Sequence, residues 1–132
     1  MIVRTCTPLA AAGTGAYKPA TRFTPASYPG TVPVWIFLEI VLDAEMVGMP
    51  IPLDAFLNDN EDRKQVGSST HYVWNHRTTN NNYLSYTWEV SDLKVPKPGE
   101  YVLDMYVAAR MMRSIVIYCQ DAPAAPAGTP SA

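Results

Sequence analysis

The chain has 132 residues, of which 48% are hydrophobic and 17% are charged, and its formal net charge at pH 7 is −2. This length suits one domain with one hydrophobic core, and the weakly acidic balance gives no broad basic surface, which argues against nucleic acid as a partner. No segment approaches the roughly 18 consecutive apolar residues that span a bilayer. The N-terminal segment also lacks the apolar region of a signal peptide, so we expect no membrane partner and synthesis in the cytoplasm.

The first thirty residues contain four prolines and three glycines. Because proline lacks a backbone donor and fixes φ, such a segment resists both helix and central strand. We therefore expect an extended N-terminal arm over residues 1–30, within which residues 2–6 can form a short strand. Cys6 in this arm and Cys119 near the far end are the two cysteines, and their spacing leaves open whether they pair or remain free thiols.

A regular alternation of side chains begins at "VWIFLEIVLD", residues 34–43. A period of two places successive side chains on opposite faces of a strand. One face of this predicted strand carries Val34, Ile36, Leu38, Ile40 and Leu42. Trp35 and Phe37 make the first half of the other face apolar too, so we expect an arm or a neighbouring molecule to cover that end. The aromatic side chains that we expect in contacts of the arm are Tyr17, Phe23, Tyr28, Trp35 and Phe37.

A second strand is predicted at residues 53–57, and the polar run "NDNEDRK", residues 58–64, follows it. Asn58, Asn60 and Asp62 alternate as the oxygen ligands of a calcium loop do. The run lacks the central glycine and the final glutamate of an EF-hand loop, whereas Asn and Asp are common in turns. We therefore interpret it as the tip of a β-hairpin and expect no metal site.

The segment "HYVWNHRTTNNNY", residues 71–83, gathers aromatic, amide and guanidinium groups. Such groups can stack on a sugar or anchor a protein interface. The candidate recognition surface consists of Trp74, Asn75, His76, Arg77, Asn80, Asn81, Asn82 and Tyr83. The same pattern also fits a β-hairpin with a solvated turn and with Trp74 in the core. His71 and His76 are five residues apart and would lie on opposite faces of a strand, so no shared metal site is expected.

Further strands are predicted on both sides of a proline-rich turn. In "YLSYTWEVS", residues 83–91, alternate side chains share one apolar face. In "VPKPGEYVLDMYV", residues 95–107, the chain turns at Pro98 and Gly99, because proline followed by glycine suits a bend. The next strand carries Tyr101, Leu103, Met105 and Val107 on its apolar face. The segment "AARMM", residues 108–112, is expected as a loop into a final strand at residues 113–119.

Leu93, the Pro98–Gly99 turn and Tyr101 resemble the tyrosine corner of immunoglobulin-like sandwiches, in which the phenol hydroxyl bonds back to the preceding turn. The stretch "PGEYVLDMYV" is also similar to small uncharacterised bacterial and phage proteins with this sandwich. The resemblance covers about residues 31–120 and implies an all-β fold, a single antiparallel immunoglobulin-like β-sandwich of about seven strands. The chain departs from the pattern because it has no cysteine pair at the usual positions between the sheets.

No sequence feature points to catalysis. The chain has neither a GxSxG nucleophile turn nor a glycine-rich phosphate loop, so we expect no enzyme activity, no catalytic residues and no cofactor. Residues 121–132 form a Pro/Ala-rich tail that has no means of burying apolar surface, and by itself it is expected to be disordered.

The expected function is that of a non-enzymatic structural or protein-interaction module that engages neighbours through its arms. A small sandwich with extended terminal segments resembles virion accessory proteins and other assembly proteins, whose arms become ordered on their neighbours. This resemblance implies other protein subunits as partners, in a homo- or hetero-oligomer such as a phage virion, as a capsid-associated protein, or in another bacterial assembly. The alternative is a β-sandwich that binds a glycan or another small ligand through the 71–83 loop.

Overall fold

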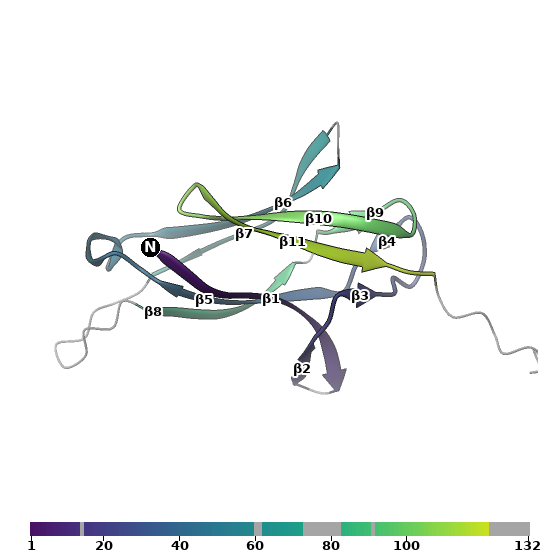
Figure 1. Ribbon diagram of the computed structural model, residues 1–132, viewed down its shortest axis with the longest axis horizontal. Helices are drawn as coiled ribbons and strands as arrows, with labels where there is room; N and C mark the ends of the chain where they lie inside the picture. Colours follow the sequence, from purple (N-terminus) through teal and green to yellow (C-terminus); the bar gives the residue numbers. More distant parts are fainter. Residues whose placement is uncertain (14, 60–61, 73–82, 91, 122–132) are drawn as a thin grey trace, which may run out of the picture.

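The computed structural model describes residues 1–13, 15–59, 62–72, 83–90 and 92–121 (Figure 1). This part of the chain consists of strands joined by turns, with one turn of 3-10 helix, η1, at Ala44–Met46. The protein is therefore all-β, as the alternation of apolar side chains predicts.

Within the described ranges, seven strands have eight or more residues: β1 (Ile2–Gly13), β5 (Val34–Val41), β6 (Ile51–Asp59), β7 (Asp62–His71), β8 (Tyr83–Val90), β10 (Gly99–Val107) and β11 (Arg110–Cys119). The short strands are β2 (Ala16–Pro19), β3 (Arg22–Phe23), β4 (Gly30–Thr31) and β9 (Lys94–Val95). The strands predicted from the alternation of side chains in residues 34–43, 53–57, 83–91 and 101–107 are confirmed, with shifts at their ends.

The strands form three sheets. The strand order is β2-β1-β5-β8 in the four-stranded sheet and β3-β11-β10-β6-β7 in the five-stranded sheet, and β4 pairs with β9. All of these pairings are antiparallel except that of β3 with β11, which is parallel. Figure 1 shows the two larger sheets as two layers, from which the β1–β2 hairpin and the tip of the β6–β7 hairpin project in opposite directions.

The two layers contribute to one hydrophobic core. On the four-stranded sheet, the inner side chains of β5 are fully buried at Val34, Ile36, Leu38 and Ile40. On the five-stranded sheet, β10 contributes Leu103, Met105 and Val107 to the same cluster. The edges of the sheets also meet: a Cβ added to Gly67 of β7 would lie 2.9 Å from Cζ2 of Trp88 in β8, so the absence of a side chain at Gly67 allows the indole to pack there.

The strands on either side of the 71–83 segment enter different sheets. β7 belongs to the five-stranded sheet and β8 to the four-stranded sheet, so these two strands do not pair with each other. The hairpin interpretation of this segment depends on residues 73–82, which lie outside the described residues. Residues 58–64, in contrast, are confirmed as a hairpin tip, because Asp59 of β6 pairs with Asp62 of β7.

The last hairpin is tighter than predicted. Val107 pairs with Arg110, so the turn consists of Ala108 and Ala109 alone and β11 begins at Arg110 rather than at residue 113. Both alanines have positive φ, 51° and 66°, as the two central residues of a type I′ hairpin turn do. The predicted loop at residues 108–112 is therefore wrong in length.

The first thirty residues lie closer to the sheets than an extended arm would. β1 runs from Ile2 to Gly13, well past the predicted strand at residues 2–6, and lies between β2 and β5. The Pro8 carbonyl accepts a bond from the N–H of Ala20, at 3.0 Å, which shows that the backbone groups of Pro8 face β2. The N–H and C=O of a strand residue point to the same side, so the donor that Pro8 lacks is missing on the side away from β5.

Candidate functional site

The structure describes little of the recognition surface predicted in the 71–83 segment. Trp74, Asn75, His76, Arg77, Asn80, Asn81 and Asn82 lie outside the described residues. Tyr83 is half-buried at the start of β8, and its hydroxyl donates a hydrogen bond to the Glu39 carboxylate of β5. Glu39 also accepts a bond of 2.7 Å from Thr5 Oγ1, so Tyr83 helps to join three strands of the four-stranded sheet.

The five aromatic side chains predicted in arm contacts fall into three environments. Tyr17 of β2 packs on Trp35 of β5 with ring centroids 5.3 Å apart, and Phe37 is also on the outer face of β5. Thus an arm residue covers the apolar end of β5, as predicted. Phe23 is buried in the core, at 3% exposure, and the Tyr28 hydroxyl donates a 2.7 Å bond to the Gln120 carbonyl after β11.

His71 lies where β7 and β8 approach each other. Its Nε2 is 2.8 Å from Ser69 Oγ, and its ring centroid is 4.0 Å from that of Tyr86. Burial lowers the pKa of His71 from its ordinary value of 6.5. Among the residues that the structure describes, no three His, Cys, Asp or Glu side chains are grouped as metal ligands, so His71 has no such set around it.

Both cysteines are free thiols. Burial raises the pKa of Cys6 to about 11, with a smaller opposing effect from the charge of Arg113, and burial alone raises the pKa of Cys119 to about 11. Both side chains are therefore protonated at neutral pH. A protonated thiol is a poor nucleophile, which argues against either cysteine as a catalytic group.

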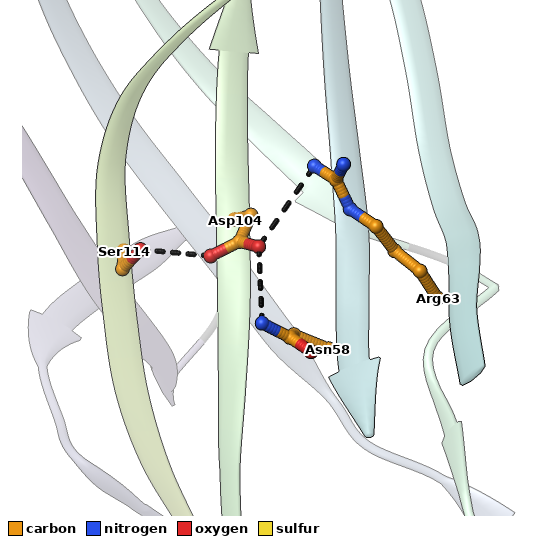
Figure 2. Close-up of polar contacts among 4 residues, drawn as sticks. All are labelled: Asn58, Arg63, Asp104 and Ser114. Carbon is orange, nitrogen blue, oxygen red and sulfur yellow. Dashed lines mark hydrogen bonds and ion pairs between the residues drawn. The ribbon is translucent and has the colours of Figure 1, made fainter. Parts of the chain in front are cut away.

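A polar cluster that the sequence analysis missed lies on the outer face of the five-stranded sheet (Figure 2). Asp104 of β10 is the buried charged residue among those described, and it is 6% exposed. Its carboxylate accepts a 2.7 Å bond from Ser114 Oγ and a longer bond, 3.4 Å, from Asn58 Nδ2, and it lies 3.8 Å from a guanidinium nitrogen of Arg63. These three partners offset the cost of removing a carboxylate from water.

Arg63 covers this carboxylate and is itself held by two aromatic rings. Its guanidinium carbon is 4.6 Å from the ring centroids of both Phe56 and Tyr106. The two rings meet edge to face with centroids 5.2 Å apart. The Arg63 side chain is still 44% exposed, so the sheet holds a cation in place while leaving part of it accessible. We call Phe56, Arg63, Asp104 and Tyr106 the arginine cluster.

Exposed apolar side chains continue this outer face along β11. Of the seven large hydrophobic side chains that are exposed in the described ranges, three belong to this strand: Met111, Val116 and Tyr118, at 56%, 41% and 42% exposure. Val116 pairs with Val102, and Tyr118 pairs with Glu100. A hydrogen bond with Glu100 raises the pKa of Tyr118, whose ring also lies 5.6 Å from the guanidinium carbon of Arg22.

The composition of this outer face resembles that of protein interfaces. It combines exposed aliphatic side chains with Tyr and Arg, which supply much of the affinity in protein interfaces. The sequence contained a partial signal, because alternation along β10 places the charged Asp104 between Val102 and Tyr106 on one face. Nothing in the sequence linked Asp104 to Arg63, which is 41 positions away in the run interpreted as a hairpin tip.

In the part of the chain that the structure describes, no helix has the length and hydropathy needed to cross a membrane. When the sequence is compared with protein-family models and with curated proteins, no family model and no curated protein matches it.

Proposed function

We propose that the chain is a non-enzymatic protein-interaction module, built as an immunoglobulin-like β-sandwich, that engages other protein subunits through the outer face of its five-stranded sheet. The single observation that carries the proposal is the gathering of Met111, Val116 and Tyr118 beside the arginine cluster. Exposed apolar groups collected on one face, with a fixed arginine among them, are typical of interaction sites.

The strand arrangement supports the immunoglobulin-like part of the proposal. β1, β5 and β8 correspond in order to strands A, B and E of that fold, and β7, β6, β10 and β11 to the opposite sheet. The Tyr101 hydroxyl donates a 2.7 Å hydrogen bond to the Lys97 carbonyl, four residues earlier. This is the bond expected of a tyrosine corner at the start of strand F.

The β1–β2 hairpin is a second part of the proposed interaction surface. Tyr17 on β2 is 46% exposed even though it packs on Trp35, so the projecting β1–β2 hairpin offers a second contact to a neighbour. A phage virion or another bacterial assembly stays a prediction from the sequence. The glycan-binding alternative also stays a prediction, because it depends on the 71–83 segment.

The test is the mass of the complex that contains the protein in an extract of its native source. We expect the parent chain to elute well above its monomer mass of 14.6 kDa. The double variant Val116→Asp, Tyr118→Ser should elute at a lower mass, since both changes remove exposed apolar surface without entering the core. The control is Thr87→Asp, at an exposed position on the outer face of β8, which should elute with the parent. A parent chain that elutes as a monomer would refute the proposal.

A further inference from the structure

We infer that the partner of this outer face is a second copy of the same chain, packed face to face across a two-fold axis that passes over Val102 of β10. The inference rests on the proposed function, because it identifies the subunit that the interaction surface binds. It is carried by the distribution of charge and apolar surface along β10 and its two neighbouring strands.

The positions of the charged side chains make the face complementary to itself. Glu100 is exposed and lies two residues before Val102, while Asp104 lies two residues after it on the same face. The axis lies between the two faces and runs across the strands at the level of Val102. A rotation of 180° about it therefore exchanges the levels of Glu100 and Asp104. Glu100 of the second copy therefore lies opposite Asp104, at the level where the guanidinium of Arg63 is held.

The arginine cluster leaves Arg63 able to take a second carboxylate. A guanidinium has five N–H donors, and in the described structure its carboxylate partner is Asp104, at 3.8 Å. The rings of Phe56 and Tyr106 each lie 4.6 Å from its guanidinium carbon and restrict the side chain, so less side-chain entropy is lost on binding. A hydrogen bond with Tyr118 orients Glu100. Because of the two-fold symmetry, the Arg63–Glu100 contact occurs twice in the dimer.

The centre of the same arrangement is apolar. Val102 and Val116 are cross-strand neighbours, and the axis places this pair against the same pair of the second copy. Two sheets pack in this way at about 10 Å with their strands nearly aligned. An apolar centre flanked by paired charges is the usual anatomy of a homodimer interface, and a net charge of −2 opposes association only weakly.

A strongly charged partner fits this face less well. Arg22 and Arg63 lie on it together with the three carboxylates Glu100, Asp104 and Asp54, so both signs of charge are present. A partner rich in one sign would meet repulsion from two or three of these five groups. A second copy supplies both signs at matched positions, which is why we assign the surface to self-association.

Sedimentation equilibrium of the purified full chain, from about 1 µM to about 200 µM, tests the inference. We expect a monomer–dimer equilibrium. Val116→Asp places two carboxylates near the axis and should raise the dimer dissociation constant by more than about 100-fold. Glu100→Gln removes two symmetry-related ion pairs and should raise it about tenfold. The matched control Glu89→Gln, on the exposed face of β8, should dissociate as the parent does.

Each alternative outcome has a defined meaning. A parent chain that remains monomeric throughout the concentration range overturns the inference, and a large complex in the native extract would then leave the proposed function standing with a different partner. A dimer that is insensitive to Val116→Asp places the interface elsewhere and overturns it too. A dimer lost in Val116→Asp but unchanged in Glu100→Gln contradicts the two-fold arrangement. Far-ultraviolet circular dichroism on each variant verifies that it is folded.

Discussion

His71 shows how one side chain couples the fold of this protein to pH. Its ring lies against Tyr86 of the opposite sheet, and burial lowers its pKa from 6.5. In the unfolded chain the same imidazole titrates at its ordinary value. Between the two pKa values the unfolded state therefore binds more protons than the folded state, so folding stability falls as the pH drops from 6.5 toward the lowered value.

We predict that His71→Gln flattens this pH dependence. The variant loses the ring contact with Tyr86 and should be less stable than the parent at pH 7.5, but it has no imidazole to protonate at position 71. Urea unfolding at pH 7.5 and at pH 5.5 should show a smaller loss of unfolding free energy in the variant. The other ionisable groups are the same in both proteins, so their contributions cancel in the difference. An equal loss in parent and variant would refute the role of His71.

At the residue level, the sequence predicted the strand face on which a side chain lies better than it predicted the burial of that side chain. Alternation placed Asp104 on the outward face of its strand, and it lies there. Its burial could not be predicted, because the cover comes from Arg63 and Phe56, which reach it only when β6 and β7 pair beside β10. The same limit applied to Phe23, predicted in an arm contact and found in the core.

At the level of elements, the turn between β10 and β11 stores backbone strain. Ala108 and Ala109 both adopt positive φ, a region in which the Cβ of an L-residue approaches the carbonyl oxygen at a cost of roughly 1–2 kcal/mol per residue. The hairpin accepts this conformation because it matches the right-handed twist of the strands that it joins. The Ala108 N–H also donates a 2.9 Å bond to the Pro52 carbonyl, which fixes the turn beside β6.

We predict that replacing this pair by Asn-Gly stabilises the protein. Asn and Gly are the residues best suited to a type I′ turn, so Ala108→Asn with Ala109→Gly should raise the unfolding free energy by about 1 kcal/mol. Urea denaturation measures the change. The control is Ala10→Gly in β1, where φ is not positive and the added backbone freedom should cost roughly 0.5–1 kcal/mol. A destabilised Asn-Gly variant would contradict the strained turn.

The prediction of elements succeeded where hydrophobic periodicity decides and failed where turn geometry decides. β5 and β10 each bury one alternating face, and both were recognised from their side chains alone. The Ala-Ala turn carries no Asn, Asp or Gly, so its sequence looked like the start of a longer loop. Similarly, no local signal showed that β7 and β8 enter different sheets, because that choice depends on pairing partners far along the chain.

At the scale of the whole molecule, the two ends of the described chain are joined through the N-terminal segment. β1 lies inside the four-stranded sheet, whereas β3, only a few residues later, pairs in parallel with the end of β11 in the five-stranded sheet. Phe23 then enters the core between them. The N–H of Gln120 donates a 2.9 Å bond to the Phe23 carbonyl, and Tyr28 bonds to Gln120 in turn. The first thirty residues thus tie the two layers together.

The position of β1 inside the four-stranded sheet changes the expected effect of removing the N-terminal residues. Composition alone predicted an extended arm over residues 1–30, since prolines and glycines interrupt this segment. The structure pairs β1 with β5 from Ile2 to Leu9 and buries Val3 and Leu9. Sequence could not show this, because β1 pairs with β5 through residues more than twenty positions away.

Deletion of residues 1–13 should therefore abolish cooperative folding. The change removes β1 and leaves β5 with an unpaired edge. It also removes two buried side chains, Val3 from the core cluster and Leu9 from its place opposite Trp35. A loss of several kcal/mol is comparable to the whole stability of a small domain. Near-ultraviolet circular dichroism and urea denaturation should show no native signal and no sharp transition. Deletion of residues 122–132, a Pro/Ala-rich segment, is the control and should keep the parent midpoint. If the 1–13 deletion unfolds cooperatively at the parent midpoint, this segment is dispensable for folding, and the β1–β5 pairing contributes little to the fold.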